Sequence, residues 1–383
     1  MTEIIYNDDL KEIQFSGKIT SFIFYSQFFE ALNLHYKLNG CNRIPTFSFE
    51  CVEHFDATVL PNLIGIGLII NKIHGVEKKI PLKFARISSS KFLDNAGFFD
   101  NVGEEKNFSE IINIDGFKNE VIKKQGLNLF DFDPRQLGFY NNQHIQKQYN
   151  NEHKVHVYND SSYEYYKLFS DPDIKKENLD TFLNAVRTNK FNDLKPFIEK
   201  HYYNILYREK RPLNEVKIIL NVISELVCNS ILYSGSICAA MLQSKDNKTI
   251  ISVSDFGVGF EYSFNLKPNF EYLVFKAYGK IENDNLKKYL LIFEALNYSK
   301  NKNRANLFTL LRYVINNGGK MRIHYDTTQV VFTSNRCSKC EDIEPIKCSR
   351  CLLNNKSDDQ LISPVRFFKD IFQGVHIEVE LNF

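Results

Sequence analysis

The first ninety residues alternate between the hydrophobic period of a strand and that of a helix. Residues Thr46–Val52 have the composition of a strand, and the tripeptide Asp56–Thr58 that follows is suited to begin a helix. The apolar stretch Val59–Ile73 continues as a buried helix, and Ile80–Phe84 has the composition of the next strand. This succession predicts a small α/β domain over residues 1–134.

A polar region separates this part from the rest of the chain. Residues 135–165 are rich in asparagine, glutamine and histidine, which is typical of a loop or linker. Residues 173–210 are rich in charged and helix-forming residues and predict connecting helices. We therefore expect residues 135–211 to join two folded domains, and two domains are the natural expectation for 383 residues.

The helical period returns after Pro212, a residue suited to the first turn of a helix. Apolar residues recur with this period at Val216, Ile219, Leu220, Ile223, Leu226, Val227 and Ile231. A hairpin is predicted next, with strands Ile237–Ser244 and Thr249–Ser254 on either side of a turn. The second of these strands leads directly into the sequence Asp255–Gly259.

A further helix is predicted over Leu307–Ile315, and the pair Gly318 and Gly319 ends it. Short strands are expected after this helix, at Lys320–Tyr325, at Gln329–Thr333 beyond a turn at Asp326–Thr328, and finally at Val375–Leu381. The C-terminal part therefore alternates helices with strands that fall into hairpins, which predicts a second α/β domain over residues 212–383.

Two short motifs in this second domain resemble those of a known superfamily. Glu225 and Asn229 are four residues apart, so they project from one flank of the same helix. Asp255-x-Gly257-x-Gly259 follows a strand. In this order the two motifs are similar to the N-box and G1 box of the GHKL ATPases, which include histidine kinases, gyrase, MutL and Hsp90. The helix, Gly-Gly and hairpin further on are similar to the run after the G2 box of that superfamily.

The resemblance implies the Bergerat ATP-binding fold, an α/β sandwich, and a role for each motif residue. Asn229 would offer an oxygen ligand to Mg²⁺, and Glu225 would orient or deprotonate the attacking nucleophile. Asp255 would accept a hydrogen bond from the amino group of adenine. Gly257 and Gly259 would let the backbone pass close to the nucleotide without a Cβ atom in the way.

The G2 box departs from the pattern of the superfamily. The superfamily carries Gly-x-Gly-Leu at the start of a helix, where backbone amides meet phosphates, but this chain has Arg304-Ala305-Asn306-Leu307. We therefore expect loosely held phosphates and slow turnover. Arg304 is a candidate for binding phosphate, with a solvated arginine as the alternative. Residues 261–303 correspond to the nucleotide lid.

Four of the eight cysteines lie close together near the C-terminus. Cys337 and Cys340 form one CxxC pair, and Cys348 and Cys351 form another. Two such pairs suit a tetrahedral Zn²⁺ site, which predicts a structural zinc insertion over residues 334–360; reduced surface thiols are the alternative. The other cysteines stand in apolar surroundings and are predicted to be core residues: Cys41, Cys51, Cys228 and Cys238.

The N-terminal domain resembles the STAS domains of anti-sigma-factor antagonists. In those domains a strand leads through an Asp-Ser-Ser/Thr-Gly-like turn into a helix, and the matching residues here are Asp56–Thr58. Ala57 stands where phosphorylatable members have serine or threonine, so we do not expect phosphorylation at that position. An unrelated α/β domain is the alternative.

Composition and charge narrow the classes of function. A net charge of +2 provides no long-range attraction to nucleic acid or to membranes. The sequence MTEIIYNDDL lacks the basic start and the apolar run of a signal peptide, so we expect a cytoplasmic protein.

The motifs leave three kinds of function open. The first is an ATP-binding regulatory or signalling protein with slow, partner-dependent ATPase or serine/threonine kinase activity, acting on a protein partner or as a homodimer. The second is a mechanical GHKL ATPase that closes a dimer. Such ATPases need a further domain that donates a lysine to the γ-phosphate, and the predicted last strand ends close to Phe383, so we favour the first. The third is a degenerate nucleotide-sensing or protein-binding module without turnover.

Overall fold

The computed structural model divides the chain into two compact units, Met1–His156 and Val157–Phe383, which we describe separately. The described residues are 2–40, 42–74, 80–83, 112–113, 153–158, 179–208, 211–234, 238–245, 247–265, 267, 270–300, 306–337 and 343–382. Within these residues the chain is of mixed α/β type, with one five-stranded sheet in each part. Predictions that fall on other residues lie outside the described structure.

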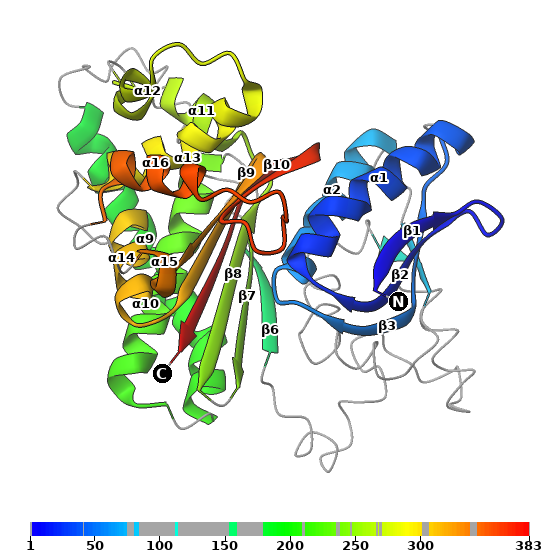
Figure 1. Ribbon diagram of the computed structural model, residues 1–383. Coiled ribbons are helices and arrows are strands. Elements are labelled where there is room, and N and C mark those ends of the chain that lie inside the picture. Colours follow the sequence, from blue (N-terminus) through cyan, green and yellow to red (C-terminus); the bar gives the residue numbers. More distant parts are fainter. Residues whose placement is uncertain are drawn as a thin grey trace. The chain divides into compact units, whose positions relative to one another are not determined.

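The first unit is an α/β layer built on a sheet of order β1-β2-β3-β4-β5. Its elements are β1 (Glu3–Asn7), β2 (Glu12–Ile19), α1 (Ser21–Asn39), β3 (Thr46–Phe55), α2 (Val59–His74), β4 (Ile80–Lys83) and β5 (Ile112–Asn113). Strands β2 to β5 are parallel, and β1 pairs antiparallel with β2. Two successive crossovers in the same direction place α1 and α2 over one face of the sheet (Figure 1). The strands and the helix predicted in this region are confirmed.

Aromatic side chains form the core between α1 and this sheet. Phe28 of α1 lies against Phe15 of β2 and Phe47 of β3, with ring centroids 5.9 and 5.7 Å apart. Thr20 caps the helix by accepting a hydrogen bond from the backbone N–H of Ile23 at 3.3 Å. The large rings supply the apolar area that a short sheet needs to bury.

One cysteine prediction in this unit is wrong. Cys51 lies in β3 but is exposed. The pairing of β2 with β3 shifts by one residue between Gln14 and Ser16, so β3 carries an extra residue at this point. Such a bulge interrupts the alternation of faces, and a cysteine in an apolar sequence then points to solvent.

The second unit is a sandwich of one sheet and a layer of helices. Its strands are β6 (His153–Tyr158), which spans the boundary between the units, β7 (Cys238–Lys245), β8 (Lys248–Asp255), β9 (Lys320–Thr333) and β10 (Val365–Asn382), in the order β6-β7-β8-β10-β9. The pairs β7–β8, β8–β10 and β9–β10 are antiparallel. The described helices are α9 (Leu179–Arg208), α10 (Leu213–Ser234), α11 (Gly259–Asn265), α12 (Leu273–Tyr278), α13 (Asp284–Lys300), α14 (Leu307–Asn316), α15 (Ser334–Cys337) and α16 (Pro345–Asn354), and they lie on one side of the sheet (Figure 1).

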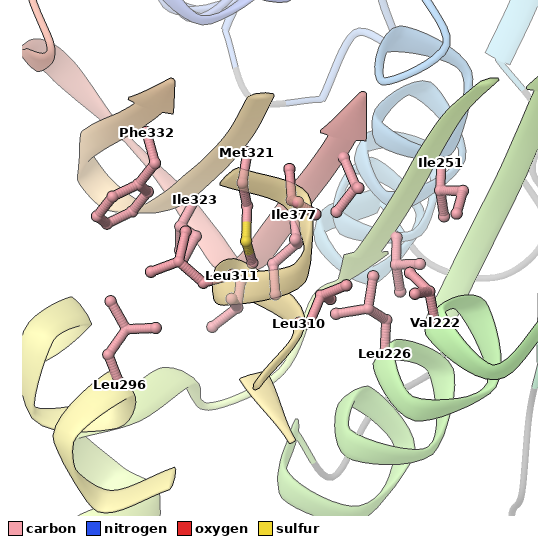
Figure 2. Packing of buried hydrophobic residues seen from close by; sticks show 14 of the residues in the cluster. Val222, Leu226, Ile251, Leu296, Leu310, Leu311, Met321, Ile323, Phe332 and Ile377 are labelled. Atoms are coloured by element: carbon pink, nitrogen blue, oxygen red, sulfur yellow. The ribbon is translucent and has the colours of Figure 1, made fainter. Parts of the chain in front are cut away.

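The core lies between the sheet and the three helices α10, α13 and α14 (Figure 2). Every apolar position predicted for the stripe of α10 is buried. Along β10, Ile377 and Val379 belong to the cluster that the helices cover, while His376 and Glu378 alternate with them. Within the described residues, α10 is the one helix long and apolar enough to cross a membrane, and 67% of its most apolar window is buried in the protein.

Several elements differ from the sequence predictions. Residues His153–Tyr158 form a strand within the predicted linker, because Val155 and Val157 alternate with polar residues. Helix α9 is not only a connector, since the hydroxyl of Tyr202 donates to the carbonyl of Ala240 in β7 at 2.8 Å. Helix α13, expected in the lid, contributes ten buried residues to the unit.

The turn predicted at Asp326–Thr328 is also wrong, because β9 is one continuous strand. Both parts of β9 pair with β10, and the irregularity lies in β10, whose register shifts between Phe367 and Phe372 and again before Val375. Asp326 has a φ of 59° at this point. The extra residues of β10 therefore form a bulge, and this bulge lies beside the candidate site.

Candidate functional site

Asp255 is the last residue of β8 and lies at the centre of the candidate site. It is only 5% exposed. Its Oδ1 atom accepts hydrogen bonds from the backbone N–H of Gly257 at 3.3 Å and of Val375 at 3.2 Å. The side chain of Ser230, on α10, also hydrogen-bonds the carboxyl group. The carboxyl group is therefore fixed by β10, by its own turn and by α10.

Burial raises the pKa of Asp255 from 3.8 to about 7, although the hydrogen bonds from Val375, Gly257 and Ser230 act in the opposite direction. Near neutral pH the group therefore exists in both protonation states. A buried carboxyl group poised in this way at the wall of a cavity is typical of a functional site.

The backbone around Asp255 is packed too closely for most side chains. A Cβ atom on Gly257 would lie 1.9 Å from the carbonyl oxygen of Ser234, and one on Gly374 would lie 2.0 Å from that of Asp255. Gly374 also has a φ of 100°, which favours glycine. The Gln373 side chain donates to the Gly257 carbonyl at 3.2 Å. The turn after β8 is thus held between the end of α10 and the bulge of β10.

Gly259 has a second structural role at the start of α11. Its φ is 72°, and a Cβ atom there would lie 2.4 Å from a ring carbon of Tyr325. Any side chain at this position would displace the tyrosine, whose hydroxyl accepts a hydrogen bond from the backbone N–H of Glu261 at 3.4 Å. Both glycines of the motif are therefore required by packing within the protein itself.

A cavity of about 120 Å³ opens beside Asp255. It is lined by residues from α10, the turn after β8, α11, α13, the start of α14 and β10: Leu226, Asn229, Ser230, Tyr233, Ser234, Asp255, Gly259, Phe260, Ser263, Phe264, Lys267, Ala295, Tyr298, Ser299, Asn306, Leu307, Val375 and Ile377. This space is several times the volume that one water molecule needs. Its walls are largely apolar, with a few polar groups, as small-molecule sites are.

The structure brings together four of the six residues predicted for the nucleotide site. Asn229, Asp255 and Gly259 line the cavity, and Gly257 lies in the same turn. Glu225 is buried one turn before Asn229 on α10 and is not among the lining residues. Arg304 lies outside the described residues.

Asn306 lines the cavity at the start of α14, where the superfamily pattern has a glycine. It is the N-cap of the helix, and its side-chain oxygen accepts from the backbone N–H of Thr309 at 3.0 Å. The residue therefore satisfies one of the amides that would otherwise remain available at this helix end. Leu307 follows it into the cavity wall.

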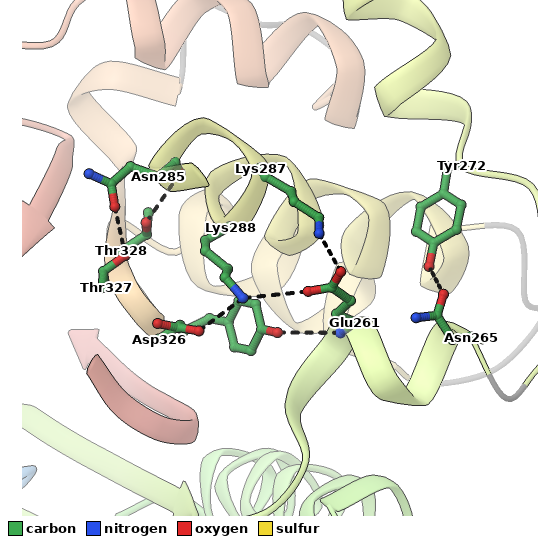
Figure 3. A network of polar contacts seen from close by, with 10 residues as sticks. Glu261, Asn265, Tyr272, Asn285, Lys287, Lys288, Asp326, Thr327 and Thr328 are labelled. Carbon is green, nitrogen blue, oxygen red and sulfur yellow. Dashed lines mark hydrogen bonds and ion pairs between the residues drawn. The ribbon is translucent and has the colours of Figure 1, made fainter. Parts of the chain in front are cut away.

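Ion pairs fix α11 against α13 and β9 (Figure 3). Glu261 pairs with Lys287 at 2.5 Å and with Lys288 at 3.4 Å, and Lys288 also pairs with Asp326 at 3.0 Å. The pKa of Glu261 is lowered, mainly by its hydrogen bond with Lys287. This half-buried network gives the start of the predicted lid a defined position.

The cysteine cluster is described only in part. Cys348 is buried and Cys351 is half-buried, one turn apart on α16, and Cys337 ends α15. Cys340 lies outside the described residues. The described residues contain no group of three histidine, cysteine or acidic side chains that could hold a metal ion. The zinc site, which needs Cys340, stays a prediction.

Comparison of the chain with protein-family models, with curated proteins and with solved structures gave no match.

Sequence analysis did not identify Ser230, Gln373 or Gly374. Ser230 follows Asn229 directly, and Gly374 precedes the alternating run of the last strand. A glycine inside a strand often marks a place where another segment of backbone lies close, but the sequence does not identify that segment.

Proposed function

We propose that this chain is a cytoplasmic ATP-binding regulatory protein. Its second unit would be a GHKL-type domain with the Bergerat fold, and its first unit would be a STAS-like domain that communicates with a protein partner. The order of helix, hairpin, motif, helix and final strands in the second unit supports this proposal. The largely parallel sheet of the first unit, with both helices on one face, supports it as well.

The observation that carries the proposal is the buried carboxyl group of Asp255 at the wall of the cavity. When ionised, it offers an acceptor in a low-dielectric site whose walls are largely apolar. The amino group of adenine would supply the matching donor. Because Oδ1 already accepts two backbone hydrogen bonds, Asp255 does not need to move to make this contact.

Asn229 and Glu225 would act at the phosphate end of the same ligand. Asn229 lines the cavity and carries a neutral amide oxygen, so it fits the oxygen ligands that Mg²⁺ prefers. When bound, Mg²⁺ would neutralise phosphate charge. Glu225, one turn earlier on α10, would orient or deprotonate the nucleophile.

Turnover by the isolated chain would be slow. Asn306 uses its own side chain to cap α14, so this helix end offers fewer amides to phosphates than a glycine-rich loop does. Phosphoryl transfer depends on positioning, and a partner that completes the contacts to the phosphates would raise the rate.

The first unit is better suited to binding a partner than to being phosphorylated at the turn before α2. Ala57 and Thr58, at the turn before α2, are 1% and 2% exposed. A kinase needs access to the hydroxyl group that it modifies. We therefore propose that this unit signals by binding a protein partner through its surface, and not through phosphorylation of this turn.

Calorimetric titration with ATP and with GTP in the presence of Mg²⁺ tests the proposal. Guanine carries an acceptor oxygen where adenine carries its amino donor, and a buried carboxylate would leave that oxygen unpaired. We expect ATP to bind at least about tenfold more tightly than GTP. Equal affinity for the two nucleotides, or no binding of either, would contradict the proposal.

A further inference from the structure

Lys267 carries its ammonium group into a cluster of aromatic rings, which we call the aromatic cage. Its Nζ atom lies 3.7 Å from the ring centroid of Tyr298, 5.0 Å from Phe264, 5.2 Å from Tyr233 and 5.8 Å from Phe270. These distances are within the range of cation–π attraction. The four rings come from α10, α11, α13 and the segment before α12, so the cage is formed by the folded unit and not by one helix.

The cage belongs to the cavity that contains Asp255. Lys267 lines this cavity together with Tyr233, Phe264 and Tyr298. Tyr233 is four residues after Asn229 on α10, so the two residues lie on the same face of that helix. The ring of Tyr233, 5.2 Å from the ammonium group of Lys267, is therefore carried by the helix face that also carries the asparagine to which we assign Mg²⁺.

The charged residues of the cavity indicate why Lys267 matters for binding a nucleotide. Among the described residues that line the cavity, Asp255 is the one acid and Lys267 the one cation. A nucleotide brings several negative charges on its phosphate chain, and an ionised Asp255 disfavours them. Burying phosphate charge without a cation in the site would be costly.

We propose that Lys267 binds the phosphate chain of the nucleotide and that the aromatic cage holds its ammonium group when no phosphate is present. The inference rests on the proposed function. A charge-assisted hydrogen bond to phosphate is stronger than attraction to rings, so a phosphate draws the flexible lysine out of the cage. Lys267 then provides the contact that a glycine-rich loop before α14 would otherwise make.

Substitution Lys267→Met tests this assignment, because methionine keeps the apolar stem that fills the cage but loses the charge. We expect ATP affinity to fall about tenfold or more, while adenosine affinity stays within about twofold. Lys276→Met, at an exposed lysine on α12 whose side chain pairs with Glu271, is the matched control and should change neither. Equal losses for ATP and adenosine, or no loss for ATP, would overturn the assignment.

A measurement on the parent protein makes the test independent of the stability of the variant. Acylation of lysines by a small reagent, mapped by mass spectrometry, should show that ATP protects Lys267 and that adenosine does not. Unchanged reactivity of Lys267 at saturating ATP would also overturn the assignment. If the parent binds neither ATP nor adenosine, the proposed function itself is wrong. That result differs from ATP binding that leaves the reactivity of Lys267 unchanged, which contradicts only the assignment of Lys267.

Discussion

The burial of the Asp255 carboxyl group suits ligand binding but lowers the stability of the fold. The carboxylate that would accept a hydrogen bond from a base is buried in the folded protein. It therefore lacks the hydration that it has in the unfolded chain. The backbone N–H groups of Gly257 and Val375 compensate for part of this loss. Sites that bind ligands often carry such a destabilising group.

The stability of the protein should therefore depend on pH through this residue. Asp255 releases its proton near pH 3.8 when unfolded and near pH 7 when folded. Because the folded state holds the proton more tightly, stability falls as pH rises from 3.8 to about 7 and stays lower above it. Asp255→Asn removes this titration, so its free energy of unfolding relative to the parent should rise by about 3 kcal/mol between pH 5 and pH 8.

Urea unfolding of both proteins at the two pH values measures this difference. Asp358→Asn, at an exposed position after α16, is the control and should show no such rise. A relative stability of Asp255→Asn that is the same at pH 5 and pH 8 would show that the carboxyl group is not buried as described.

At the scale of elements, the bulge of β10 holds the turn after β8 in place. Gln373, Gly374 and Val375 each contact this turn, through a side chain, a close backbone approach and a backbone N–H. Sequence patterns predicted the hairpin β7–β8 and the helices α10 and α14, because their periods are local. They did not predict the bulge, since it depends on the register between β9 and β10.

Gly374→Ala should therefore damage both stability and binding. Gly374 and Gly279 both have positive φ, 100° and 77°, but a Cβ atom on Gly279 would meet nothing within 4 Å. Backbone strain alone should cost about 1–3 kcal/mol in Gly279→Ala. Gly374→Ala adds a collision with the Asp255 backbone, so it should lose more stability and also bind ATP more weakly. Equal losses in denaturant unfolding and unchanged ATP binding would contradict this role of the bulge.

At the scale of the whole molecule, the chain forms two units, each with its own sheet. The two α/β regions were predicted from composition and period. The place of β10 between β8 and β9 was not, because strand order in a sheet is a long-range property that a single sequence does not display. The predicted zinc insertion depends on Cys340, outside the described residues, and the protein partner also stays a prediction.

The central claim, that an ionised Asp255 accepts a hydrogen bond from adenine, is tested most directly by titrating adenosine into the parent and into Asp255→Asn at pH 8 and pH 6. Adenosine lacks phosphate groups, whose own titration near pH 6 would obscure the result. With a pKa of about 7, the parent should bind about tenfold more weakly at pH 6 than at pH 8. Asp255→Asn should bind weakly at both. Parent affinity that is independent of pH, or a variant that binds as tightly as the parent, would contradict the account.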